Sequence, residues 1–237
     1  HTPDPLNIGG RGASASGPLT LQKNAVARWR GLFIMGCAFL TLPHPMEPRP
    51  QTSAPHSVSG HQIGYLSNGG AERYLLEAES TTGFVAWQLA DGTILVSQAT
   101  QVSLRRSPSL SFWACDGYRD TTPTGCIISF DGHGNSLTHL DVRALSGLEY
   151  LDCSFNQLTA LDLHGLIDLE ALDVENNNLT NLEVRHLRNL RLLNCASNFL
   201  KNLDLSGMDT LEVLEKDNNP LHSIKIDGCT SLRDFGT

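Results

Sequence analysis

Apolar residues in the second half of the chain recur with a period of 21 residues. Within "YLDCSFNQLTALDLHGL" (150–166), the leucines from Leu158 to Leu166 stand two or three positions apart, and "YLDCS" alternates in the manner of a short β-strand. A chance helical stripe would not keep this period, and a coiled coil needs seven-residue spacing. The period predicts a solenoid of stacked coils. Its apolar columns are Leu137, Leu158, Leu179, Leu200 and Leu221; Leu140, Leu161, Leu182, Leu203 and Ile224; Val142, Leu163, Val184, Leu205 and Ile226; Leu148, Leu169, Leu190, Leu211 and Leu232; and Leu151, Leu172, Leu193, Leu214 and Phe235.

Stacking is what makes this spacing favourable. One coil cannot bury its own leucines, but stacked coils bury them as continuous columns, each side chain contributing about 1.5–3 kcal/mol. The alternation directs Leu151 and Cys153 into the core and leaves Tyr150, Asp152 and Ser154 pointing outward. One asparagine per coil shares a further phase, where we expect it to turn the chain and bond to backbone groups of neighbouring coils. These structural asparagines are Asn135, Asn156, Asn177, Asn198 and Asn219.

The units "LEYLDCSFNQ", "LTALDL" and "LEALDVENNN" carry a family resemblance. Residues 137–237 resemble bacterial leucine-rich-repeat proteins of the internalin-like surface type. The resemblance covers a little under half of the chain and identifies no particular ligand. It implies a curved solenoid with a parallel sheet on its concave face, an irregular or 3-10 convex side, binding of proteins or other macromolecules, and a secreted or cell-surface location. The repeats lack the prolines of secreted bacterial ubiquitin ligases, which disfavours that subfamily.

Two features depart from the repeat. Lys216 falls in the column of Cys153, Val174 and Cys195, where an inward charge is costly, so we expect local distortion or a lysine that extends past the wall. The sequence also stops at Thr237, inside the strand of the fifth coil. Because a solenoid normally ends in a polar cap, we expect the chain to continue or its open end to be covered.

The first half shows no repeat. "RYLLEAES" and "GFVAWQLADGTILVSQA" predict strands with a turn at Asp91–Gly92, so residues 61–126 should form a small β-rich capping domain against the first coil. Residues 127–237 would be the solenoid of about five coils. Residues 1–60 are predicted to be a disordered extension and linker. Their apolar run, residues 31–43, is too short to span a bilayer; it could be a degenerate export signal or sequence upstream of the true start.

Charge narrows the class of partner. The net charge is −8, and residues 137–237 alone account for −8 because the other two segments cancel. Such an acidic surface argues against a nucleic-acid partner. The outward positions of the predicted sheet form an acidic strip that would suit a basic protein or other macromolecule, although its aspartates could instead simply follow the repeat consensus. The candidate ligand-binding residues are Asp131, His133, Tyr150, Asp152, Ser154, Asp173, Glu175, Asn194, Glu215 and Asp217.

The sequence predicts no catalytic residue, no cofactor and no metal. Nucleophile motifs are missing, and no compact set of His, Cys and Asp has the spacing of a metal site. The predicted function is therefore a non-enzymatic binding module. Two alternatives stay open: the recognition arm of a larger enzyme or effector, and a structural spacer in a surface or virion assembly. Cys115 and Cys126 could form a disulfide or could be two unrelated thiols.

Overall fold

The computed structural model describes residues 64–68, 73–98, 101–105, 109–115, 117–119 and 123–235. The predicted extension, residues 1–60, lies outside them. The described residues contain β-strands and no helix, and so no helix long and apolar enough to cross a membrane. The strands are β1 (Gly64–Asn68), β2 (Arg73–Ser80), β3 (Val85–Leu89), β4 (Ile94–Ser97), β5 (Gln101–Arg105), β6 (Ser109–Ala114), β7 (Ile127–Asp131), β8 (Leu137–Asp141), β9 (Tyr150–Asp152), β10 (Ala171–Asp173), β11 (Leu192–Asn194), β12 (Asn202–Asp204), β13 (Val213–Glu215), β14 (Ser223–Lys225) and β15 (Asp234–Phe235).

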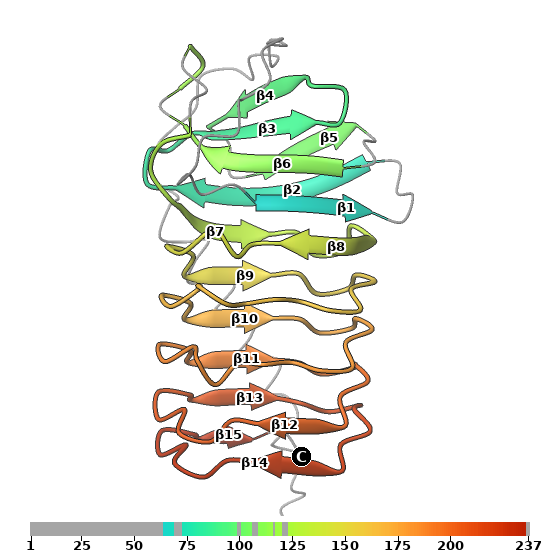
Figure 1. Cartoon of the computed structure of the whole chain (residues 1–237), viewed down its shortest axis with the longest axis vertical. Coiled ribbons are helices and arrows are strands. Elements are labelled where there is room, and N and C mark those ends of the chain that lie inside the picture. Colours follow the sequence, from blue (N-terminus) through green and yellow to red (C-terminus); the bar gives the residue numbers. More distant parts are fainter. Residues whose placement is uncertain are drawn as a thin grey trace, which may run out of the picture. The chain divides into compact units, whose positions relative to one another are not determined.

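The 21-residue period becomes one wall of a solenoid (Figure 1). Strands β7, β9, β10, β11, β13 and β15 pair side by side, all parallel. Their register equals the sequence period, since Leu151 pairs with Leu172 and Leu172 with Leu193. On the opposite side of the coils, β12 pairs with β14 in parallel. The predicted leucine-rich-repeat solenoid, with a parallel sheet on one face, is confirmed.

The apolar columns form the core. In the column of Leu151, the side chains of Leu172, Leu193 and Leu214 are also fully buried, and Cys153 and Cys195 fill smaller positions beside them. Burial raises the pKa of the Cys195 thiol to about 12 and that of Cys153 well above its usual range, so both are inert packing groups. The core opens at the fifth coil, where Leu221, Ile224 and Leu232 are half-buried and Phe235 is exposed.

Lys216 accommodates its unfavourable column by reaching outward. Its ammonium group lies 4.6 Å from the centroid of the Phe235 ring and 3.6 Å from a carboxylate oxygen of Asp217. Most of its side chain is covered, with 15% exposed. The aliphatic stem therefore passes the core while the charge ends on an aromatic face and a carboxylate, as the second of the two expectations described.

Strands precede the coils, as the pattern of residues 61–126 predicted. β4, β3, β6, β1 and β8 form an antiparallel sheet, and β5 and β2 extend the solenoid sheet through an antiparallel pairing of β2 with β7. Both links to the first coil are thus main-chain ladders. A domain boundary at residue 126 stays a prediction.

The possible disulfide is absent. Cys115 and Cys126 are both free thiols. The two side chains have different neighbours, because the buried Cys115 thiol faces the carbonyl oxygen of Gly117 at 3.9 Å while Cys126 packs against Gly147.

The outer wall, comprising residues 137–143 and their equivalents in later coils, carries ion pairs between coils. Arg143 binds Asp141 at 2.8 Å within its coil and approaches Asp162 of the next coil at 3.9 Å. Asp204 accepts Arg185 and Lys225, each at 3.6 Å. A hydrogen bond from Arg143 lowers the pKa of Asp141. Such exposed pairs contribute little stability each.

Candidate functional site

The candidate residues follow the solenoid sheet strand by strand. Asp131 of β7 pairs in register with Asp152 of β9, which pairs with Asp173 of β10. Asn194 of β11 and Glu215 of β13 continue the row. Because neighbouring strands lie about 4.8 Å apart, three aspartates occupy successive steps of one ladder. We call this row, the positions two residues further on and Tyr150 beside them the acidic strip.

Much of the acidic strip is less exposed than the sequence suggested. The expectation that all its members point into solvent is wrong for five candidates, which are buried: Tyr150, Asp152, Ser154, Asp173 and Asn194. His133 is exposed, with 49% of its side chain accessible, and Asp131, Glu175, Glu215 and Asp217 are half-buried. The strip is therefore open at its two ends and along the Glu175 side.

Hydrogen bonds to the strand ends account for part of this burial. In four coils, the side-chain oxygen accepts the backbone N–H two residues further on, which is the usual way for Asp and Asn to end an extended segment. The carboxylate of Asp152 also accepts the Ser154 hydroxyl at 2.6 Å and the Tyr150 hydroxyl at 3.4 Å. The four backbone bonds are His133 to Asp131 at 2.9 Å, Ser154 to Asp152 at 2.9 Å, Glu175 to Asp173 at 3.0 Å and Ala196 to Asn194 at 3.2 Å.

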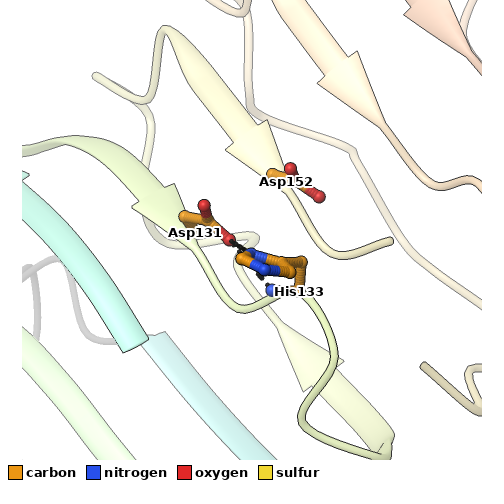
Figure 2. Close-up of side chains that lie close together, drawn as sticks. All are labelled: Asp131, His133 and Asp152. Carbon is orange, nitrogen blue, oxygen red and sulfur yellow. Dashed lines mark hydrogen bonds and ion pairs between the residues drawn. The ribbon is translucent and has the colours of Figure 1, made fainter. Parts of the chain in front are cut away.

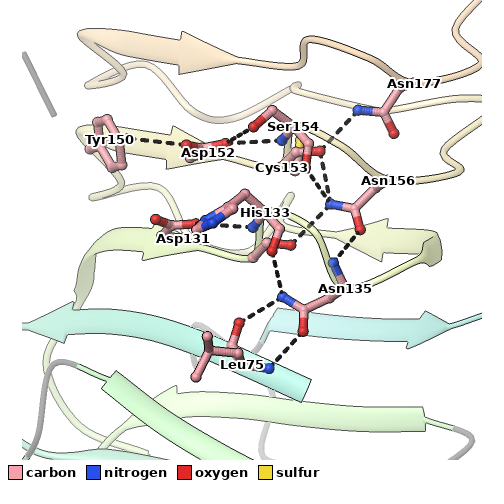
Figure 3. Close-up of polar contacts among 11 residues, drawn as sticks. Leu75, Asp131, His133, Asn135, Tyr150, Asp152, Cys153, Ser154, Asn156 and Asn177 are labelled. Carbon is pink, nitrogen blue, oxygen red and sulfur yellow. Dashed lines mark hydrogen bonds and ion pairs between the residues drawn. The ribbon is translucent and has the colours of Figure 1, made fainter. Parts of the chain in front are cut away.

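A ladder of asparagines runs beside the strip (Figure 3). The Asn156 oxygen accepts the backbone N–H groups of Asn135 and Leu137, and its amide donates to three carbonyl oxygens, of Gly132, Cys153 and Ser154. The amides of Asn177, Asn198 and Asn219 repeat the three donated bonds in the later coils. Their oxygens each accept one backbone N–H, that of Leu158, Leu179 and Leu200 respectively. Asn135 differs, because it bonds to both backbone groups of Leu75 in β2 and so ties the β-rich strands to the first coil.

The turn after β7 brings one cluster together that the sequence did not reveal. Asp131, His133 and Asp152 each offer a ligand atom, and the three atoms lie within 4.8 Å of one another (Figure 2). The search for ligand spacing along the sequence could not find this cluster, because Asp152 comes from the next coil and only the register places it there. Two carboxylates and an imidazole suit a transition-metal cation. In the structure the His133 ring is engaged at 2.6 Å by the Asp131 carboxylate.

The pKa of the Glu215 carboxyl group reflects the negative charge of the strip. Its partial burial first, and then the carboxylates of Asp234, Asp217 and Glu175, raise its pKa. A raised carboxyl pKa means that the charged form is less stable in the folded protein than in the unfolded chain. Acidic groups on neighbouring strands therefore raise one another's pKa at this position.

Glu215→Gln should consequently stabilise the fold at pH 7. The ionised carboxylate destabilises the folded state at every pH above its folded pKa, and this effect disappears below the unfolded pKa of about 4.3. We expect a small rise in the urea midpoint at pH 7 that vanishes near pH 4. Glu183→Gln on the outer wall, where the side chain is exposed, is the control. A gain that persists at pH 4 would contradict the electrostatic cause.

No protein-family model and no curated protein matches this chain. Among solved structures, the chain is similar to InlJ from Listeria monocytogenes, whose functional domain is described as including a cysteine ladder. The identity is 26% over 46% of this chain, and the match covers 31% of that chain with a TM-score of 0.33. The present chain thus spans less than a third of the matched protein's length. At so low a TM-score, this similarity supports no conclusion about the present chain. The solenoid fold is assigned from the strand register and the buried columns.

Proposed function

We propose that the chain is a non-enzymatic binding module that takes a basic protein or other basic macromolecule on the acidic strip of its solenoid sheet. One observation carries the proposal. Asp131, Asp152 and Asp173 end their strands through backbone bonds. The carboxylates of Glu175 and Asp217 instead contact side chains, the Asn194 amide at 3.1 Å and the Lys216 ammonium at 3.6 Å, so ending the strand does not require an acid at these two positions. The other coils place His133, Ser154 and Ala196 at that phase, so the position tolerates varied chemistry.

The energetic argument points to a cationic partner. Carboxylates on adjacent strands repel one another, which the raised pKa of Glu215 reflects. A partner that brings ammonium or guanidinium groups between them relieves this repulsion, and complementary charge also speeds encounter. Glu175 and Glu215 are half-buried, so they remain accessible while being less screened than fully exposed groups.

The test is to neutralise two charges on the strip. Glu175→Gln combined with Glu215→Gln should weaken binding of a fluorescein-labelled peptide of nine lysines by about 2- to 30-fold, given about 0.2–1 kcal/mol for each of the two exposed charge pairs. Fluorescence anisotropy with the full chain at low salt measures this. Raising the salt should weaken binding of the unchanged protein as well.

The matched control moves the same charge change to the outer wall. Asp162→Asn with Glu183→Gln removes two exposed acids and should leave the affinity nearly unchanged. Equal losses in the two double variants would show that net charge, rather than the strip, attracts the peptide. A complete lack of saturable binding by the unchanged protein would favour the structural-spacer interpretation.

A further inference from the structure

The turn after β9 holds a large aromatic residue in a backbone conformation that disfavours one. Phe155 has φ +55°, in the left-handed region. Bulky residues rarely adopt this region, whereas glycine and asparagine tolerate it. The same phase in the other coils is occupied by small or polar residues with φ between +54° and +67°, namely Gly134, Asn176, Ser197 and Asn218.

Packing does not explain this choice. Phe155 is 48% exposed and contributes nothing to the buried columns, whose members come from other phases of the repeat. A phenylalanine here therefore combines backbone strain with an apolar side chain that is about half exposed to water, and both are unfavourable for folding. Strain of this kind, retained without a packing reason, is typical of functional positions.

The position of Phe155 connects it to the acidic strip. It directly follows Ser154, and its backbone N–H donates to the carbonyl oxygen of Glu175 in the next coil at 2.8 Å. On the other side, the N–H of Gly134 donates to the carbonyl oxygen of Ser154 at 3.0 Å. The backbone of Phe155 thus lies at the margin of the strip and is bonded to the backbone of Glu175, whose carboxylate the proposed function uses.

We propose that Phe155 is an anchor for arginine side chains of the partner. A guanidinium group stacks flat on an aromatic ring and can donate to a neighbouring carboxylate at the same time, which an ammonium group does less well. This inference rests on the proposed function and adds to it that the partner presents arginine in preference to lysine.

The test uses Phe155→Asn, which restores the residue type of two other coils. Relief of strain should raise the thermal midpoint by about 2 to 4 °C. Anisotropy with a labelled nine-arginine peptide should show binding weakened by about 2- to 5-fold, while binding of the nine-lysine peptide stays unchanged. We therefore expect the thermal midpoint to rise while the affinity for the nine-arginine peptide falls. If Phe155 had a purely structural role, Phe155→Asn would lower the thermal midpoint instead.

Phe199→Asn is the control. Phe199 is also exposed, at 54%, but its backbone lies outside the left-handed region. Phe199→Asn should therefore neither raise the thermal midpoint nor weaken binding of the nine-arginine peptide. If the unchanged protein binds both peptides and Phe155→Asn alters neither affinity, the arginine anchor is wrong and the acidic strip survives. If it binds neither peptide, both proposals are wrong.

Discussion

Replacing Asn156 with alanine is expected to lower the free energy of unfolding by about 3–5 kcal/mol, because it strands several buried backbone groups. The side chain is 8% exposed and satisfies two N–H groups and three carbonyl oxygens, all within 3.1 Å. Alanine offers none of these bonds, and the closed wall of the coil leaves little room for water to replace them. Such a loss is a large fraction of the stability of an ordinary domain.

Asn219→Ala is the internal comparison for this prediction. Asn219 makes the same kinds of bond, to the Leu200 N–H and to the carbonyl oxygens of Cys195 and Lys216, but it is itself half-buried and directly precedes the open fifth coil. Water can reach the groups that it leaves behind, so the loss should be clearly smaller. Urea unfolding followed by circular dichroism measures both variants. Equal losses, or a loss below about 1 kcal/mol for Asn156→Ala, would contradict the argument from buried unsatisfied groups.

The sequence predicted the solenoid because its information is periodic. A residue and its neighbour in the next coil, such as Leu151 and Leu172, are always 21 positions apart, so the period of the pattern is also the register of the sheet. No long-range pairing has to be guessed. The phase of Asn156 was visible in the same way, although its individual bonding partners were not.

Side-chain bonding on the strip could not be predicted in the same manner. The alternation of apolar and polar residues predicted that the Asp152 side chain points away from the core. Its carboxylate, however, accepts the Ser154 N–H instead of extending into solvent. Local bonds of this kind compete with water, and pattern alone does not decide the outcome. The cluster of Asp131, His133 and Asp152 was missed because a search for ligand spacing within one segment does not compare adjacent coils. Phe155, by contrast, had a readable signal, since every other residue in its column is small or polar.

The β-rich strands show the opposite limit. The alternation of apolar and polar residues in these strands, and the turn after Leu89, could be predicted from the sequence. The sheet order β4-β3-β6-β1-β8, however, joins segments far apart in the sequence. In particular, β1 pairs with β8 and β2 with β7, so these strands are completed by the first coil. No local pattern specifies such partners, because many strands of similar composition could pair equally well.

Phe130→Ala tests whether the β-rich strands and the solenoid unfold together, and we expect a loss of about 3–5 kcal/mol. The Phe130 ring is fully buried and stacks on Phe112 at a centroid distance of 4.5 Å, and Phe112 stacks in turn on Trp87 at 5.7 Å. In the sheet, Phe130 pairs with Ala78 on one side and with Leu151 on the other. The ring therefore belongs to one continuous core that includes both sets of strands.

The measurement compares two probes of unfolding in the unchanged protein and the variant. In a Trp29→Phe background, tryptophan fluorescence reports on Trp87 and Trp113 in the β-rich strands, whereas far-ultraviolet circular dichroism reports on all strands. Coincident transitions that shift together in Phe130→Ala are expected for a cooperative unit. Leu221→Ala, in the half-buried fifth coil, should cost less and is the control. Separate transitions, with only the fluorescence one displaced, would instead mean that the solenoid folds without its neighbouring strands and that the ladders joining β1 to β8 and β2 to β7 contribute little coupling.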